Sequence, residues 1–148
     1  MSVAPTLGVY KLPTIDNEPM RNYEPNSKDR QELQKAVDEL LACNPFEIPV
    51  IIDGQEFRSG KLAKQVNPGD HAQAVCYYHE ADERIVNIAI EGALKAKKQW
   101  MNMPWSERAA ISMKAADLIA HKYRYQLLAA TMVGQGKNVW QAEIDAGA

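Results

Sequence analysis

The chain has 148 residues, of which 46% are hydrophobic and 24% are charged, so it is long enough to bury the core of one globular domain. Its 17 basic and 19 acidic residues give a net charge of −2, which argues against the clustered basic surface that nucleic-acid binding requires. No apolar run approaches the roughly 20 residues that span a bilayer, so no membrane span is predicted.

Residues 1–25 are predicted to form an extended arm. Prolines punctuate this stretch and no hydrophobic period persists through it, which favours a segment that is laid on a surface or partly disordered. A helix is predicted next, capped by Asn26 or Ser27 and ended by Asn44-Pro45, because proline disfavours helical geometry in the residue before it. The apolar side of this helix consists of Leu33, Val37, Leu40 and Leu41.

The middle of the chain is predicted to be rich in strands. Asp53-Gly54 separates "PVII" from "QEF", and the type I′ turn of a tight hairpin needs two residues with positive φ. A further strand is predicted over residues 72–78, where β-branched and aromatic residues collect. These few strands cannot close a sheet by themselves, so some strand edges are expected to stay open for pairing.

Four helical segments are predicted from Ala81 onward. The first reaches Trp100, the second follows Pro104, which suits a first helical turn, the third ends at Gly134 and the fourth begins after Asn138. The apolar side of the first segment is predicted to be Ile85, Ile88, Ala89, Ala93, Ala96 and Trp100. The apolar side of the second segment is predicted to be Ala109, Met113, Ala116 and either Ile119 or Ala120. The aromatic residues predicted to act as packing anchors are Trp100, Trp105, Trp140, Tyr123 and Tyr125.

The stretch "GQGK", residues 134–137, invites comparison with a phosphate-binding loop. A P-loop needs Gly-x-x-x-x-Gly-Lys-Ser/Thr after a strand, and a dinucleotide fingerprint needs Gly-x-Gly-x-x-Gly in the same context. Here the preceding segment is a predicted helix, and Asn138 stands where Ser or Thr should. We therefore predict a corner between two helices, in which Gly134 takes the left-handed position after the third helix and Asn138 caps the fourth.

Neither the cysteines nor the histidines show the spacing of a metal or redox site. Cys43 and Cys76 lie far apart without a C-x-x-C partner, and they are predicted to be free thiols packed as small apolar groups. His71, His79 and His121 are scattered along the chain, and they are predicted to lie on the surface or in polar networks.

No pair of side chains has the spacing of an acid–base or nucleophilic site. Glu143 and Asp145 are two residues apart on a predicted helix, so they point to different faces. Ser106 is predicted to be an N-cap with no base placed to activate it. We therefore predict that this chain contains no catalytic, cofactor-binding or metal-ligating residue.

The N-terminus has no targeting signature. It lacks the basic and apolar regions of a secretory signal, and it is not an Arg-rich amphipathic transit peptide. The residues alone therefore favour a cytosolic protein, and a mature or truncated organellar protein stays open.

Several stretches resemble the aldehyde dehydrogenase superfamily. In the opening of that family a hairpin and an "NP" strand precede a helix, and residues 66–119 here contain "NP" before a helix with "ALKAKKQW", followed by "PWSER" and "AADLI". The segments "NEP" at 17–19, "ELQKAVDELL" at 32–41 and "EIPVIIDGQEF" at 47–57 are similar to the branch that oxidises L-glutamate γ-semialdehyde. The stretch "HKYRYQLLAATMVGQGKNV" at 121–139 is most similar to the fungal form of that branch.

This resemblance implies an α/β fold, with residues 26–148 as an incomplete N-terminal part of the Rossmann-like NAD-binding domain: helix-rich, with a β-hairpin and accessory strands. It also implies a homo-oligomeric enzyme that oxidises L-glutamate γ-semialdehyde to L-glutamate with NAD in proline degradation, in the mitochondrial matrix of eukaryotes. In such enzymes a cysteine thiolate attacks the aldehyde, hydride passes to NAD, and water hydrolyses the thioester.

The family's glycine-rich NAD segment, catalytic glutamate and catalytic cysteine are all expected beyond Ala148, and neither Cys43 nor Cys76 matches the nucleophile. The chain is therefore expected to be an N-terminal fragment that is inactive by itself. The alternative is a self-contained, helix-rich binding or structural module that uses its open strand edges and tryptophan-bearing helices to hold a partner.

Overall fold

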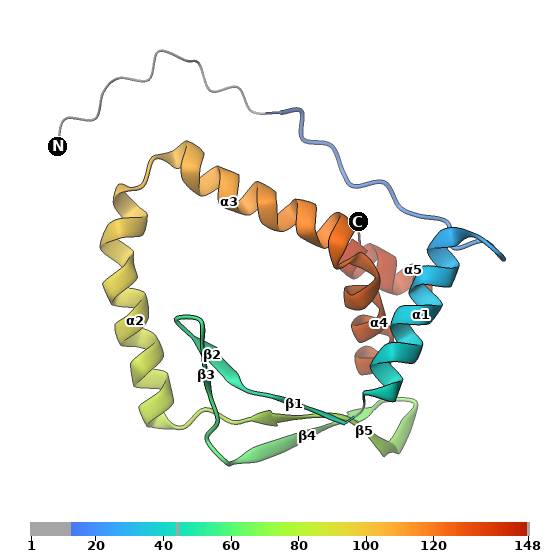
Figure 1. The fold of residues 1–148 in the computed structure, drawn as a ribbon, viewed down its shortest axis with the longest axis horizontal. Helices are drawn as coiled ribbons and strands as arrows, with labels where there is room; N and C mark the ends of the chain where they lie inside the picture. The colour runs from blue at the N-terminus through green and yellow to red at the C-terminus, as the bar shows by residue number, and fades with distance from the viewer. Residues whose placement is uncertain (1–12, 44, 148) are drawn as a thin grey trace.

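The computed structural model describes residues 13–43 and 45–147. Figure 1 shows α1, α4 and α5 grouped at one side, α2 at the opposite side, α3 joining the two sides, and the strands running between them. The elements in chain order are α1 (Lys28–Ala42), β1 (Phe46–Ile48), β2 (Val50–Ile52), β3 (Gln55–Phe57), β4 (Leu62–Asn67), β5 (Asp70–His79), α2 (Glu83–Asn102), α3 (Trp105–Asp117), the π-helix η1 (Leu118–Lys122), α4 (Arg124–Gln135), α5 (Val139–Ala142) and the π-helix η2 (Glu143–Gly147).

The predicted arm lies partly outside the described residues, which begin at residue 13. Residues 13–24 form neither helix nor strand, as the prolines predict. The helix that follows is capped by Ser27, whose side chain accepts a hydrogen bond from the Arg30 amide. It ends at Ala42, ahead of Pro45; Asn44 lies outside the described residues.

The predicted hairpin at Asp53-Gly54 is confirmed. β2 and β3 pair antiparallel with Ile52 opposite Gln55, and the two turn residues have φ values of 51° and 75°. Both values lie in the left-handed region that a type I′ turn requires.

We expect Gly54→Ala to destabilise the protein by about 1 kcal/mol or more, because a side chain at positive φ crowds its own backbone. No other atom lies within 4 Å of the site of the added Cβ, so the cost comes from φ alone. Gly134→Ala is the matched control: Gly134 lies inside α4 with equally open space around it, and there alanine should stabilise by about 1 kcal/mol. Thermal midpoints that move in the same direction would contradict the turn assignment.

The strand predicted over residues 72–78 is the central part of a longer strand in a three-stranded sheet. β5 lies in the middle, antiparallel to β4 and parallel to β1, in the order β1-β5-β4. β1 was not predicted from the sequence, and β4 was predicted only through the family resemblance, as the "NP" strand. β1 has only three residues, and β4 has no buried residue, so neither shows a hydrophobic period of its own.

The four predicted helices correspond to α2, α3, α4 and α5, whereas the π-helices η1 and η2 were not predicted. Asp82 caps α2 by accepting from the Ile85 amide. Pro104 is the N-cap of α3 and not its first residue, and Ser106 lies inside α3 and is no cap. The prolyl ring cannot donate a hydrogen bond, so it suits either place.

The hydrophobic core lies between α1, α4 and α5. Its fully enclosed members are Leu33, Leu128 and Ala142, and Tyr23 of the arm packs against them. The predicted apolar sides of the helices agree only in part. In α1, Leu33 and Ala36 are buried, whereas Leu41 is exposed.

Most of the predicted aromatic anchors are not buried. Trp100, Trp105, Trp140 and Tyr123 are 46, 54, 55 and 43% exposed. Of the predicted stripe of α2 only Ile85 is buried, and α3 has no buried residue. The anchor prediction was wrong for these four aromatic residues, because helical spacing identifies an apolar side but does not show whether another element covers it.

Candidate functional site

The "GQGK" stretch forms a corner between α4 and α5. Gly136, with φ 66° and ψ 27°, takes the left-handed position at the end of α4. The prediction that Gly134 would do so was wrong, since Gly134 lies inside the helix. Asn138 caps α5 as predicted, in a reciprocal capping box with Gln141.

Lys137 of this corner forms an ion pair with Asp145. Its ammonium group is therefore held by a carboxylate of the same corner. The glycines and the lysine are accounted for by the turn and by this pair, so the geometry gives the corner a structural role.

The most extensive buried polar cluster was not found by sequence reasoning. Arg124 and Glu143, which begin α4 and η2, form an ion pair whose side chains are both fully buried. Arg124 Nη1 also donates to Glu18 of the arm over 2.8 Å. A charged residue beside two tyrosines gives no sequence signal for such a pair, because its partners lie in segments that are distant in the chain.

The arm completes this cluster with main-chain and side-chain bonds. The Tyr23 hydroxyl donates to Glu143 Oε2 over 2.6 Å, and the Arg21 amide donates to Glu143 Oε1 over 2.8 Å. Arg124 Nη2 donates to the Pro19 carbonyl over 3.3 Å. We call Glu18, Tyr23, Arg124 and Glu143 the arm clamp, because they hold residues 18–23 against α4 and η2.

A second group of polar contacts joins the arm to α1. The Tyr125 hydroxyl donates to Asp29 Oδ1 over 2.6 Å. Arg21 Nη1 donates to the same carboxylate oxygen over 3.0 Å and to the Tyr125 hydroxyl over 2.9 Å. The arm is therefore attached to α1 and α4, two of the three helices that enclose the core.

The ionisation of these groups argues against proton transfer. Burial raises the pKa of Glu143, but the hydrogen bonds from Arg124 and Tyr23 outweigh it and hold the pKa below its ordinary value. Burial and the bond to Glu143 raise the pKa of Tyr23. The Tyr125 hydrogen bond and the Arg21 guanidinium lower the pKa of Asp29. None of these groups is tuned toward neutral pH, as a general acid or base would be.

The three histidines and two cysteines lie at separate places in the described structure. His71 and His121 are exposed, as predicted for surface residues. His79 is buried in a polar network with Glu47, the other predicted setting. Cys76 is buried, whereas Cys43 is exposed, so the prediction of a packed thiol was wrong for Cys43.

No metal site is found in the part of the chain that the structure describes, since no three His, Cys, Asp or Glu side chains there have the required proximity. Glu143 belongs to the arm clamp and Asp145 pairs with Lys137, so the two carboxylates have different partners, as their spacing predicts.

Within residues 13–43 and 45–147, no helix has the length and hydropathy to cross a membrane.

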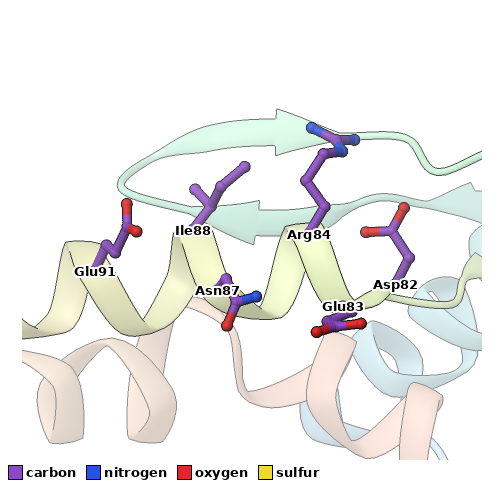
Figure 2. Close-up of a pocket in the computed structure, with 6 residues that line it drawn as sticks. All are labelled: Asp82, Glu83, Arg84, Asn87, Ile88 and Glu91. Carbon is purple, nitrogen blue, oxygen red and sulfur yellow. The ribbon is translucent and has the colours of Figure 1, made fainter.

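An open depression on α2 is lined by six residues. Figure 2 shows Arg84, Ile88 and Glu91 projecting from one side of the helix and Glu83 and Asn87 from another. Asp82, the sixth, is occupied as the helix cap. The six include no nucleophilic side chain and no buried polar group, so the depression has the character of a solvated helix face.

An apolar stripe runs along α2 beside this polar face. Val86, Ile90, Leu94 and Met101 recur at helical spacing and are 45, 51, 63 and 63% exposed. Of the residues described in α2, only Ile85 is buried, so this helix has an exposed apolar surface that a further partner could cover.

Comparisons with known proteins identify relatives over nearly the whole chain. The model of the aldehyde dehydrogenase family matches residues 55–148. A delta-1-pyrroline-5-carboxylate dehydrogenase of the fungus Agaricus bisporus is 54% identical over 142 residues, which is 96% of this chain and 26% of the relative. The human enzyme named delta-1-pyrroline-5-carboxylate dehydrogenase, mitochondrial, is 41% identical over 134 residues, 90% of this chain and 24% of its own length.

A solved structure has the same fold. The crystal structure of the delta-pyrroline-5-carboxylate dehydrogenase of Mycobacterium tuberculosis bound with NAD has a TM-score of 0.90 and 36% identity, over 95% of this chain and 26% of that one. The predicted α/β fold and the predicted similarity to the fungal form are confirmed. The chain spans about a quarter of the length of these relatives.

Proposed function

The chain belongs to the aldehyde dehydrogenase family, and we propose that it acts as part of an NAD-dependent enzyme that oxidises L-glutamate γ-semialdehyde to L-glutamate. The semialdehyde is in equilibrium with pyrroline-5-carboxylate, for which the relatives are named. The observation that carries the proposal is the similarity over 96% of this chain to a relative of that name at 54% identity.

The strand-to-helix connection in the described residues supports placing the NAD contacts elsewhere in the enzyme. NAD supplies the hydride acceptor for such an oxidation, and its pyrophosphate is typically held where a glycine-rich turn joins a strand to a helix. The strand-to-helix connection between β5 and α2 consists of Glu80, Ala81 and Asp82 and is followed by Glu83. It has no glycine, and its carboxylates would repel a pyrophosphate.

We therefore assign the reacting residues and the NAD contacts to a part of the enzyme outside these 148 residues, and to this chain a share in building the NAD-binding domain. Residues 26–148 would form one part of that domain, and residues 1–25 an arm attached through the arm clamp. The exposed stripe of Val86, Ile90, Leu94 and Met101 supports this role, because it offers an apolar surface to the rest of such a domain.

We further propose a homo-oligomer in the mitochondrial matrix. The relatives from Emericella nidulans and human carry the word mitochondrial in their names. A cytoplasmic enzyme is the alternative. Imaging the product of the complete reading frame in cells would distinguish a cytoplasmic from a matrix location.

The test is NADH formation by the product of the complete reading frame, supplied with NAD and L-glutamate γ-semialdehyde. We expect NADH that depends on the semialdehyde. We expect none from residues 1–148 alone, because their described part holds neither a dinucleotide turn nor a nucleophile with a base beside it.

Each outcome separates one part of the proposal from the rest. Activity with other aldehydes but not with the semialdehyde would overturn the substrate. No activity with any aldehyde would overturn the enzymatic role and favour a self-contained binding module. NADH formation by residues 1–148 alone would overturn the assignment of the reacting residues to another part of the enzyme.

A further inference from the structure

His79, the last residue of β5, connects three segments of the strand region. Its side chain is 5% exposed. Its Nδ1 accepts a hydrogen bond from the Gly60 amide over 3.2 Å, and its Nε2 lies 2.8 Å from Glu47 Oε1. Gly60 belongs to the connection between β3 and β4, and Glu47 belongs to β1.

These two partners determine the protonation of the ring. A backbone amide can only donate, so Nδ1 must carry a lone pair and no proton. Nε2 then carries the proton and donates it to the Glu47 carboxylate. Each nitrogen of His79 therefore holds a different segment.

Charged side chains lie on each of the segments that His79 joins. Glu47 also accepts from Arg58, and Arg58 pairs in turn with Glu56. Lys61 is paired with Glu80 beside the ring. The hydrogen bond from His79 and the Arg58 guanidinium lower the pKa of Glu47, so this carboxylate is ionised and already shared between two donors.

A second proton on the ring would have a specific local effect. It would replace the lone pair of Nδ1 with an N–H that faces the N–H of Gly60, which loses its acceptor. Glu47 would still attract the ring, but its single negative charge would then face two cations, His79 and Arg58. The bond to Gly60 is therefore the contact that protonation breaks.

We propose that His79 is a proton-sensitive contact, whose protonation releases the amide of Gly60 in the segment from Arg58 to Lys61. The Lys61 carbonyl and ammonium group stay bonded to Glu80, so the release is confined to the Gly60 amide, and we expect it as the pH falls through the range of roughly 8 to 5 in which imidazoles titrate.

The test is hydrogen exchange at the Gly60 amide in the product of the complete reading frame, corrected for the intrinsic effect of pH. We expect its protection to fall by about tenfold between about pH 8 and pH 5.5, the scale of one lost hydrogen bond. His79→Gln cannot gain a proton and should show no such pH dependence. His71→Gln, at an exposed histidine of the same strand, should behave as the unaltered protein does.

Either of two results would overturn the proposal: protection that does not change with pH in the unaltered protein, or an equal loss in His79→Gln. If His79→Gln does not fold, ¹⁵N spectra of selectively labelled histidine replace it. We then expect His79 to show an unprotonated Nδ1 and a protonated Nε2 at high pH. A protonated Nδ1 at that pH would contradict the proposal.

Discussion

Replacing Arg124 with methionine should lower the stability of the protein by about 3–5 kcal/mol, because it leaves a buried charge without its partner. Glu143 is fully buried and would keep only the Tyr23 hydroxyl and the Arg21 amide as donors. The fully buried Nε of Arg124, which has no hydrogen-bond partner among the described residues, shows that even the intact cluster is not completely satisfied. The arm would lose its bond from Arg124 to Glu18 at the same time.

The measurement is hydrogen exchange of the α4 amides in the product of the complete reading frame. A loss of this size corresponds to a rise of about two to four powers of ten in the exchange rate. Lys137→Met is the control, because it removes a lysine from a partly exposed pair with Asp145, which should cost about 1 kcal/mol or less.

A double variant, Arg124→Met with Glu143→Met, separates the buried charge from the packing. Replacing both members of a buried pair is often nearly neutral, so the double variant should be more stable than Arg124→Met alone. If Arg124→Met proves no more damaging than Lys137→Met, the arm clamp does not stabilise the protein.

Residues 1–148 expressed alone should lack a cooperative tertiary structure. Each large apolar side chain left in water forgoes about 1.5–3 kcal/mol of burial, and the net stability of a domain is only about 5–15 kcal/mol. Val86, Ile90, Leu94 and Met101 on α2 are all 45% or more exposed, and α3 has no buried residue among those described. The burial free energy that these helices forgo is comparable to the net stability of a whole domain.

We expect helical far-UV circular dichroism, binding of an apolar dye, and a broad or absent thermal transition. The product of the complete reading frame is the control and should bind little dye, because the proposed domain would cover the stripe. A sharp two-state melt with dispersed amide resonances from residues 1–148 would instead support a self-contained module.

The features that sequence analysis predicted correctly depend on neighbouring residues. Asp53-Gly54 forms its turn because these two residue types tolerate positive φ. Ser27 and Asn138 cap their helices because their side chains reach amides three residues ahead. The glycine that ends α4 was misplaced by two residues, since Gly134 and Gly136 both suit that position and only packing selects one.

The family could also be predicted from the sequence, because its motifs are strings of neighbouring residues. The exposure of the tryptophans and of Cys43 could not be predicted from the sequence. Periodicity identifies an apolar side of a helix, but it does not show whether another element packs against that side. The strand β1 was missed for a related reason, and β4 was predicted only through the family resemblance, since each is held by pairing with β5 and not by a pattern of its own.

By itself, then, the sequence determined the family, the hairpin turn, the helix caps and the order of most elements, since each depends on residues within a few positions of one another. Only the tertiary structure decided the partners of the charged groups. Arg124 meets Glu18 from 106 residues away, and His79 meets Glu47 across 32 residues. The strength of a charge pair depends on separation and burial in space, and neither quantity is written in the spacing of the chain.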